Sequence, residues 1–474
     1  MTSKQENQLL CISPIDGRYR NKTENLKNYF SEFALQYYRL YVEITYLQQL
    51  LTVLNIYNHS EFEKILEFLH EFSIEDAMEI KQIEKTTNHD IKAIEYFIQN
   101  KLKALNLTKW IPYVHFGLTS QDINNTAIPL SLRSYFNSDY LKNSYEIMNK
   151  LGEMVDKWKH ISFITRTHGQ PASPSTIGKE LNVFLYRLNK QYSILTSTKI
   201  WGKFGGATGN FNAHVCAYPH IDWENFGNTY LTSIGLYRNK YTTQIDNYEN
   251  LSVLFDAMVR VNVILIDMCR DIWSYISMDY FKCKVEKNEV GSSTMPHKVN
   301  PIQFENAEGN LLLANTLFTF MSQKLPISRL QRDLTDSTVL RNLGTAFGHI
   351  EIAYSNIITG LNKLDINMDK INEDIEKNWV VISEAIQTIL RKHNFPDPYE
   401  KMKSLTRENN KIGKEQLYDF VNSLDVSSET KAEILQITPY NYVGYACNVT
   451  THCILKNKTV QSEPIPNIIR ISSI

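Results

Sequence analysis

The most regular pattern of apolar residues in the chain runs from about Asn250 to Tyr280. Its members recur at alternating steps of three and four residues, with no glycine or proline between them: Leu251, Leu254, Met258, Val261, Leu265, Met268, Ile272 and Tyr275. An a/d repeat sustained in this way predicts a long helix that buries one seam against other helices.

Four further stretches predict helices of the same kind. One carries the apolar seam Leu181, Leu185, Leu188, Tyr192 and Leu195, and the others are about Gln121–His160, Glu305–Leu325 and Asp333–Leu364. Five such segments in the middle of the chain indicate a helical bundle. Seams on helices this long often pack against other subunits, so we expect an oligomer.

Polar stretches separate these helices: Thr165–Pro174, Gly202–His214 and Val290–Pro301. We expect them to be loops that hold the chemistry on a rigid frame. The expected fold is all-α, with an N-terminal helical domain over residues 1–115, a central bundle domain over 116–364 and a smaller helical domain over 365–474. The last of these contains a loop-like segment, Asn394–Pro398.

Composition narrows the classes of protein. The 474 residues include 50 Lys+Arg against 51 Asp+Glu, and this balance argues against a nucleic-acid-binding protein. No apolar run approaches the ~18 residues of a transmembrane helix, and the polar start lacks a secretory signal. The six cysteines are scattered and form no C-x-x-C pair, so we expect free thiols in the cytoplasm and no metal site.

The stretch Gly291–Pro301 has an unusual composition. It combines a Gly-Ser-Ser start, one lysine, one asparagine and two prolines, just before a predicted helix. Backbone N–H groups beside an ammonium can stabilise an oxyanion, and a serine in such surroundings can act as a base or a nucleophile. A polar loop without chemistry is the competing interpretation.

Two histidines are candidates for proton transfer. His168 stands among hydroxyl and cationic groups, and histidine is the side chain best suited to this role near neutral pH. The segment Thr86–Asp90 offers His89 as a rival, which Asp90 could orient, although Asn88 or Asp90 could equally cap a helix. A lone histidine is more often structural.

Three groups of residues have the chemistry of anion sites. They are Arg18 with Tyr19, Thr119 with Ser120, and Arg332 with Ser337, Thr338 and Arg341. A helix that starts near Asp333 would present N–H groups to a phosphate. Helix caps and surface charges are the simpler explanations. The glycines between Gly202 and Gly209 do not match a dinucleotide-binding motif.

Together these motifs resemble a known family. Gly291–Pro301 is similar to the G-S-S-x-M-P-x-K-x-N-P signature of the fumarase/aspartase superfamily. Within it, the chain resembles the adenylosuccinate lyases of the bacterial type over Ser13–Tyr19, Thr86–Asp90, Phe116–Ser120, Thr165–Pro174, Tyr241–Gln244, Gln331–Arg341 and Tyr399–Arg407. Gln121, where glutamate is common, is a small departure.

The resemblance implies a three-domain helical fold and a homotetramer whose active sites are shared among three subunits. It implies elimination of fumarate from adenylosuccinate, giving AMP, and from succinylaminoimidazole carboxamide ribotide, without a metal or other cofactor. The purine nucleotide is then the small-molecule partner, with no nucleic acid and no membrane.

The resemblance also assigns roles. Ser292 is the candidate general base, with Ser293 as the alternative, and His168 is the candidate general acid, with His89 as the alternative. The succinyl end would be bound by Thr119, Ser120, Gln244, Lys298 and Asn300, and the phosphate by Arg18, Tyr19, Arg332, Ser337 and Arg341. Asn88, His89, Asp90 and Thr338 complete the substrate-binding set.

Two other functions stay open at this point. Another fumarate-releasing lyase of the superfamily, such as argininosuccinate lyase, would need no phosphate-binding residues. A non-catalytic structural protein on the same scaffold would be expected to have lost Ser292, His168 or Lys298, and all three are present.

Overall fold

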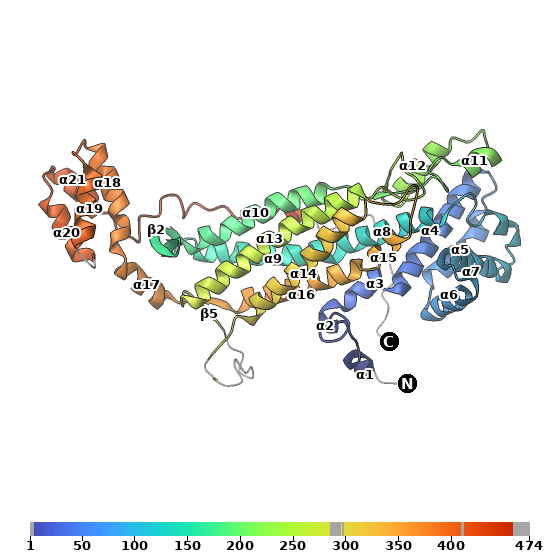
Figure 1. The fold of residues 1–474 in the computed structure, drawn as a ribbon, viewed down its shortest axis with the longest axis horizontal. Helices are drawn as coiled ribbons and strands as arrows, with labels where there is room; N and C mark the ends of the chain where they lie inside the picture. The colour runs from blue at the N-terminus through green and yellow to red at the C-terminus, as the bar shows by residue number, and fades with distance from the viewer. Residues whose placement is uncertain (1–3, 285–294, 296–297, 409–411, 458–474) are drawn as a thin grey trace.

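The computed structural model describes residues 4–284, 295, 298–408 and 412–457. The chain is elongated, with long helices side by side in the middle and groups of shorter helices at both ends (Figure 1). Strands within the described residues form only three two-stranded sheets. The expectation of an all-α fold is confirmed.

Long helices form the central bundle. They are α8 (Ser120–Tyr135), α9 (Leu141–Trp158), α10 (Ile177–Ser197), α13 (Glu249–Ser277), α14 (Ile302–Lys324) and α16 (Leu343–Lys363). α13 packs against α10 and α14, and α16 against α9 and α14. The predicted seam of α13 from Leu251 to Ile272 is at most 4% exposed, because its apolar stripe faces these neighbours.

Two predicted helices are divided. The stretch Gln121–His160 forms α8 and α9, separated by a π-helical turn over Phe136–Tyr140. The stretch Asp333–Leu364 forms a short α15 (Thr335–Leu340) and then α16. The prediction that a helix begins near Asp333 was two residues early, because the Asp333 carboxylate accepts the Thr335 N–H at 2.8 Å and lies before the first turn.

The polar stretch expected as a loop at 165–174 is largely a β-hairpin, so that prediction was wrong. Strand β1 (Ser162–Thr167) pairs antiparallel with β2 (Gln170–Thr176). The turn residues His168 and Gly169 have φ angles of 52° and 75°. Positive φ at both central residues is the requirement of a tight type I′ hairpin turn.

The other strands are short. Strand β3 (Trp201–Gly202) pairs parallel with β4 (Tyr237–Arg238), and β5 (Phe281–Cys283) pairs antiparallel with β6 (Leu364–Ile366). The β5–β6 pair joins the end of α13 to the end of α16. Among the described residues, no helix is long and apolar enough to cross a bilayer.

The remaining helices, most of them shorter, build the two ends of the molecule. One end contains α1 (Lys4–Leu9), α2 (Arg20–Thr23), α3 (Lys27–Phe30), α4 (Glu32–Val53), α5 (His59–His70), α6 (Ile74–Thr87), α7 (Asp90–Ala104), α11 (Asn212–Ala217) and α12 (Trp223–Ser233). The other contains α17 (Met368–Lys377), α18 (Ser383–Lys392), α19 (Pro398–Glu408), α20 (Lys414–Ser423) and α21 (Ser428–Leu435).

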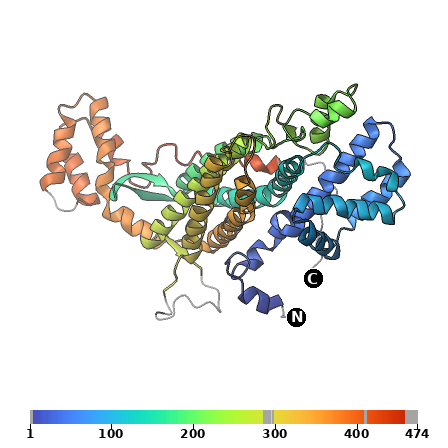
Figure 2. The ribbon, with the colours of Figure 1, turned by 45° about the vertical axis from the view of Figure 1, so that its right-hand side comes forward.

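Buried apolar side chains gather in three separate clusters. One joins α4–α7 to the first half of α8 and to residues 200–236, the second fills the bundle, and the third lies within the C-terminal helices. Helices α11 and α12 therefore lie beside the N-terminal helices, although they come from the middle of the chain (Figure 2). The domain boundaries at residues 115 and 364 stay a prediction.

Candidate active site

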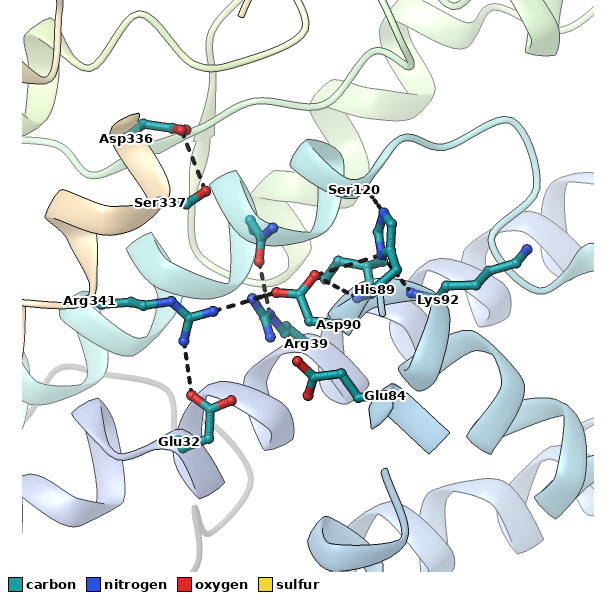
Figure 3. A network of polar contacts seen from close by, with 12 residues as sticks. Glu32, Arg39, Glu84, His89, Asp90, Lys92, Ser120, Asp336, Ser337 and Arg341 are labelled. Atoms are coloured by element: carbon teal, nitrogen blue, oxygen red, sulfur yellow. Dashed lines mark hydrogen bonds and ion pairs between the residues drawn. The ribbon is translucent and has the colours of Figure 1, made fainter. Parts of the chain in front are cut away.

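His89 is the N-cap of α7, and this position fixes which ring nitrogen of its imidazole accepts a hydrogen bond. The Nδ1 atom accepts the backbone N–H of Lys92 at 3.2 Å, so the ring proton is on Nε2. That Nε2 lies 3.4 Å from the Oγ of Ser120, at the start of α8 (Figure 3). Asn88 closes α6 in the left-handed conformation, so neither Asn88 nor Asp90 is the N-cap of α7.

Asp90 faces two arginines. Its Oδ2 atom lies 2.6 Å from Nη2 of Arg39 and 3.7 Å from Nη2 of Arg341 (Figure 3). Burial alone would raise the pKa of the Asp90 carboxyl, but the charge of Arg39 and a backbone hydrogen bond bring it below its ordinary value. The nearest approach to His89 is 3.7 Å, so Asp90 is directed at the arginines and does not hydrogen-bond the imidazole.

Arg341 continues this network towards α4 and α15. Its Nη1 atom lies 3.0 Å from Oε2 of Glu32, and both side chains are partly exposed. Ser337, one turn earlier, has its Oγ 3.5 Å from Oδ1 of Asp336. Arg332 is half-buried, and its Nε atom has no hydrogen-bond partner among the described residues. Thr338 is exposed beside them.

A second group of predicted residues lies along the bundle. The Arg18 guanidinium stands over the Tyr19 ring at 5.7 Å, and the Tyr19 hydroxyl accepts a 3.0 Å hydrogen bond from Nδ2 of Asn306 on α14. Lys298 is exposed and Asn300 half-buried, just before α14. The candidate bases Ser292 and Ser293 lie outside the described residues.

His168 is exposed at the tip of the β1–β2 hairpin. The hairpin is anchored to α17 close to its tip, because Nη2 of Arg166, two residues before His168, lies 2.6 Å from Oδ2 of Asp374. The Tyr280 hydroxyl donates to the same carboxylate. The hairpin lies at the end of the bundle far from α4 and α7 (Figures 1 and 2). A single chain therefore does not bring His168 together with His89.

Comparison with known proteins decides the family. The lyase family matches residues 17–314, and the adenylosuccinate lyase C-terminal family matches residues 328–443. An adenylosuccinate lyase of Dictyostelium discoideum is 51% identical over 94% of this chain and 98% of its own. One from Buchnera aphidicola subsp. Acyrthosiphon pisum is 46% identical over 93% and 98%.

The chain belongs to the adenylosuccinate lyase family. The resemblance stated from its motifs is thereby confirmed, and the chain is a lyase. The crystal structure of a fumarate lyase from Mesorhizobium sp. BNC1 has the same fold, with a TM-score of 0.71 over 90% of this chain and 96% of that one, at 15% identity. Within the described residues, no group of His, Cys, Asp and Glu side chains could hold a metal ion.

Beside the candidate site lie buried polar residues that sequence reasoning missed. The buried amide of Asn125 on α8 donates to the Tyr248 hydroxyl at 2.6 Å and accepts the Asp246 N–H at 2.9 Å. Tyr248 in turn donates to Asp336 at 2.8 Å. Helix α8 is thus tied to the segment that carries Gln244 and to α15. The signal was the polar run 121–126 inside a helix that was expected to be packed.

Two segments that carry candidate site residues are joined directly. Thr243 donates its Oγ1 hydrogen to the carbonyl oxygen of Gln331 at 2.8 Å. The neighbouring Gln244 is half-buried. The predicted succinyl-binding and phosphate-binding segments therefore lie side by side.

Proposed function

We propose that this protein eliminates fumarate from adenylosuccinate, giving AMP, and from succinylaminoimidazole carboxamide ribotide, in the cytoplasm and without a cofactor. The observation that carries the proposal is the near-full-length identity to adenylosuccinate lyases. These relatives favour it over the alternatives, an argininosuccinate lyase and a structural protein.

The proposed chemistry removes a proton from the carbon beside a carboxylate. Ser292, as an alkoxide, takes this proton, and the resulting negative charge is delocalised into the carboxylate. The electron pair then forms the C=C bond of fumarate as the C–N bond breaks. His168 donates a proton to the leaving nitrogen. Fixed donors and cations around the carboxylate lower the barrier, because negative charge accumulates there in the transition state.

The geometry favours His168 over His89 as the acid. The Nδ1 atom of His89 already accepts the backbone N–H of Lys92, so protonation there would break the cap of α7. Its one proton, on Nε2, is directed at Ser120. We therefore assign His89 to substrate binding. His168 stands exposed on a rigid turn, where it can reach a substrate held by another subunit.

The two charged ends of the substrate have separate partners in this proposal. Thr119 and Ser120 lie at the N-terminus of α8, where backbone N–H groups and the helix dipole attract a carboxylate. Gln244, Lys298 and Asn300 complete the succinyl end. The phosphate is assigned to Arg18, Tyr19, Arg332, Ser337 and Arg341, and Asn88, Asp90 and Thr338 line the remaining space.

The proposal requires a homotetramer with shared active sites. The β1–β2 hairpin, which carries His168, and helix α7, which His89 caps, lie far apart in one chain, so one substrate cannot touch both within it (Figure 1). Large apolar side chains that are exposed on α10, α13 and α14 supply surfaces for association: Val183, Tyr186, Ile194, Val253, Val263, Trp273, Leu312, Leu313 and Phe320.

The test measures loss of adenylosuccinate by ultraviolet absorbance. His168→Asn is the sharper acid variant, because asparagine tolerates the left-handed turn that alanine would strain. His168→Asn and Ser292→Ala should each lower kcat by roughly 10²–10⁴ while the tetramer persists in sedimentation. His89→Ala should mainly raise KM. Near-normal turnover of either acid or base variant, or activity of isolated monomers, would contradict the proposal.

A further inference from the structure

A charge pair is completely buried beneath the start of α8. The Nζ atom of Lys203 lies 2.7 Å from Oδ1 of Asp122, and neither side chain has any exposed surface. Lys203 belongs to the glycine-containing segment that follows β3, and its backbone N–H donates to the carbonyl oxygen of Asn125. Two buried charges need close partners, because they have lost their hydration.

Both charges have several hydrogen-bond partners. The Asp122 carboxylate accepts backbone N–H groups from Thr119 at 2.8 Å, Gly205 at 2.9 Å and Gly206 at 3.1 Å. Lys203 also donates to the carbonyl oxygen of Gly206. One carboxylate thus ties the N-cap of α8 to the turn at Gly205–Gly206, and Lys203 closes the same turn from its other side.

The same turn supports the segment that carries Gln244. A Cβ atom built on Gly209 would lie 2.5 Å from the carbonyl oxygen of Thr242, so the two backbones are in direct contact. The buried pair therefore lies beneath Thr119 and Ser120 and, through Gly209, beside Thr242–Gln244. Thr119, Ser120 and Gln244 are residues that we assign to the succinyl end of the substrate.

The positive charge of Lys203 also affects the binding of anions at the start of α8. The N-terminus of α8 attracts anions through its dipole, but a lone Asp122 carboxylate inside that first turn would repel a substrate carboxylate. The ammonium of Lys203, 2.7 Å away, cancels this repulsion. Asp122 can then order the helix start without weakening its affinity for an anion.

We propose that Asp122 and Lys203 are positioning residues for substrate carboxylate binding. Asp122 fixes the backbone of Thr119 and Ser120, and Lys203 both holds the Gly205–Gly206 turn and neutralises Asp122. This proposal rests on the proposed function, since it takes Thr119 and Ser120 as ligands of the succinyl group.

The test compares the binding of the two products, because fumarate carries only the carboxylates of the substrate and AMP carries only its phosphate. Lys203→Met should weaken inhibition by fumarate about tenfold or more, because a buried carboxylate is left uncompensated near the dicarboxylate site. Binding of AMP, measured by calorimetry on the same tetramer, should stay within about twofold. A merely structural role would weaken both products together, and that result would overturn the proposal, as would unchanged fumarate inhibition.

A double variant guards against misfolding. Lys203→Met leaves one charge unpaired, whereas Lys203→Met with Asp122→Asn removes both. The double variant should bind fumarate more tightly than Lys203→Met but less tightly than the wild type. Equal affinity of double and single variants would contradict the charge-cancelling role.

A matched control and the wild type separate the remaining possibilities. Glu351→Gln alters another buried carboxyl, which accepts the Tyr135 hydroxyl within the bundle, and should leave the affinities for fumarate and AMP unchanged. Wild-type protein that binds both products but does not cleave adenylosuccinate would contradict the proposed function, and this differs from any outcome for the variants.

Discussion

The Nη1 atom of Arg341 lies 3.0 Å from Oε2 of Glu32, so a carboxylate of the protein occupies an edge of the guanidinium that we assign to phosphate. Its Nη2 atom faces Asp90 at the same time. An arginine can bind an anion through two parallel N–H groups, and Glu32 competes for one of them. Glu32 therefore competes with a phosphate that binds this edge of Arg341.

Removing this competitor should tighten phosphate binding. A half-exposed ion pair contributes roughly 0.2–1 kcal/mol, so Glu32→Gln should lower the Kd for AMP roughly 1.5- to 5-fold. Calorimetry with AMP and with inorganic phosphate measures the change. Glu433→Gln, which breaks a comparable exposed pair with Lys392, should have no effect. Weaker AMP binding by Glu32→Gln would show that Arg341 does not contact the phosphate.

Asp374, which anchors the β1–β2 hairpin, should affect kcat. Asp374 accepts hydrogen bonds from Arg166 and Tyr280, and this carboxylate holds strand β1 two residues before His168. Asp374→Asn should lower kcat by about tenfold to 10²-fold, the cost of misplacing a reacting group by about 1 Å, with AMP binding unchanged. Asp369→Asn, exposed on the same helix, is the control. Unaltered kcat would mean that the anchor does not position His168.

Gly209 should be intolerant of a side chain. Its φ is 79°, and a Cβ atom would lie 2.5 Å from the Thr242 carbonyl oxygen. Gly209→Ala should therefore displace the segment that leads to Gln244 and raise KM for adenylosuccinate. Gly309→Ala, on α14 with nothing within 4 Å of the new Cβ, should leave KM unchanged. Steady-state kinetics decide between these results, and equal KM values would rule out the contact.

Stability should depend on the protonation of Glu351. Burial raises the pKa of this carboxyl from 4.5 to about 7, although hydrogen bonds from Tyr135 and Asn143 oppose the rise. Folding thus favours the protonated acid. The stabilisation that this gives to the folded state is fully present below pH 4.5 and is lost as pH rises through about 7. The free energy of unfolding should fall by roughly 3 kcal/mol at most.

Glu351→Gln removes this titration. Urea unfolding of wild type and variant at pH 5 and pH 8 should show that the wild type loses more stability than the variant over that interval. The same difference in both proteins would indicate that Glu351 is charged or neutral throughout.

The sequence predicted the helices well where burial is periodic. The seams of α10 and α13 could be found because every third or fourth side chain is apolar and packed. The start of α8 was also correct, since Thr119 is its N-cap as the hydroxyl pair suggested. These features depend on neighbours in sequence.

The errors arose where contacts distant in sequence decide the structure. The hairpin around His168 contains two prolines and little apolar alternation, so its pairing was not visible. Lysine and aspartate usually lie on the surface. Lys203 and Asp122 are fully buried here because each charge neutralises the other.

The buried polar residues of α8 limit which substitutions this helix can accept, in evolution and in engineering. Asp122, Asn124 and Asn125 use buried hydrogen bonds to hold other segments in place, where apolar side chains would fill the same space without any need for partners. Substitutions that make this face more hydrophobic can raise the melting temperature while they release the segments it orders. Stabilising substitutions should therefore be sought outside this face of α8, because a change that raises the melting temperature there should also lower turnover.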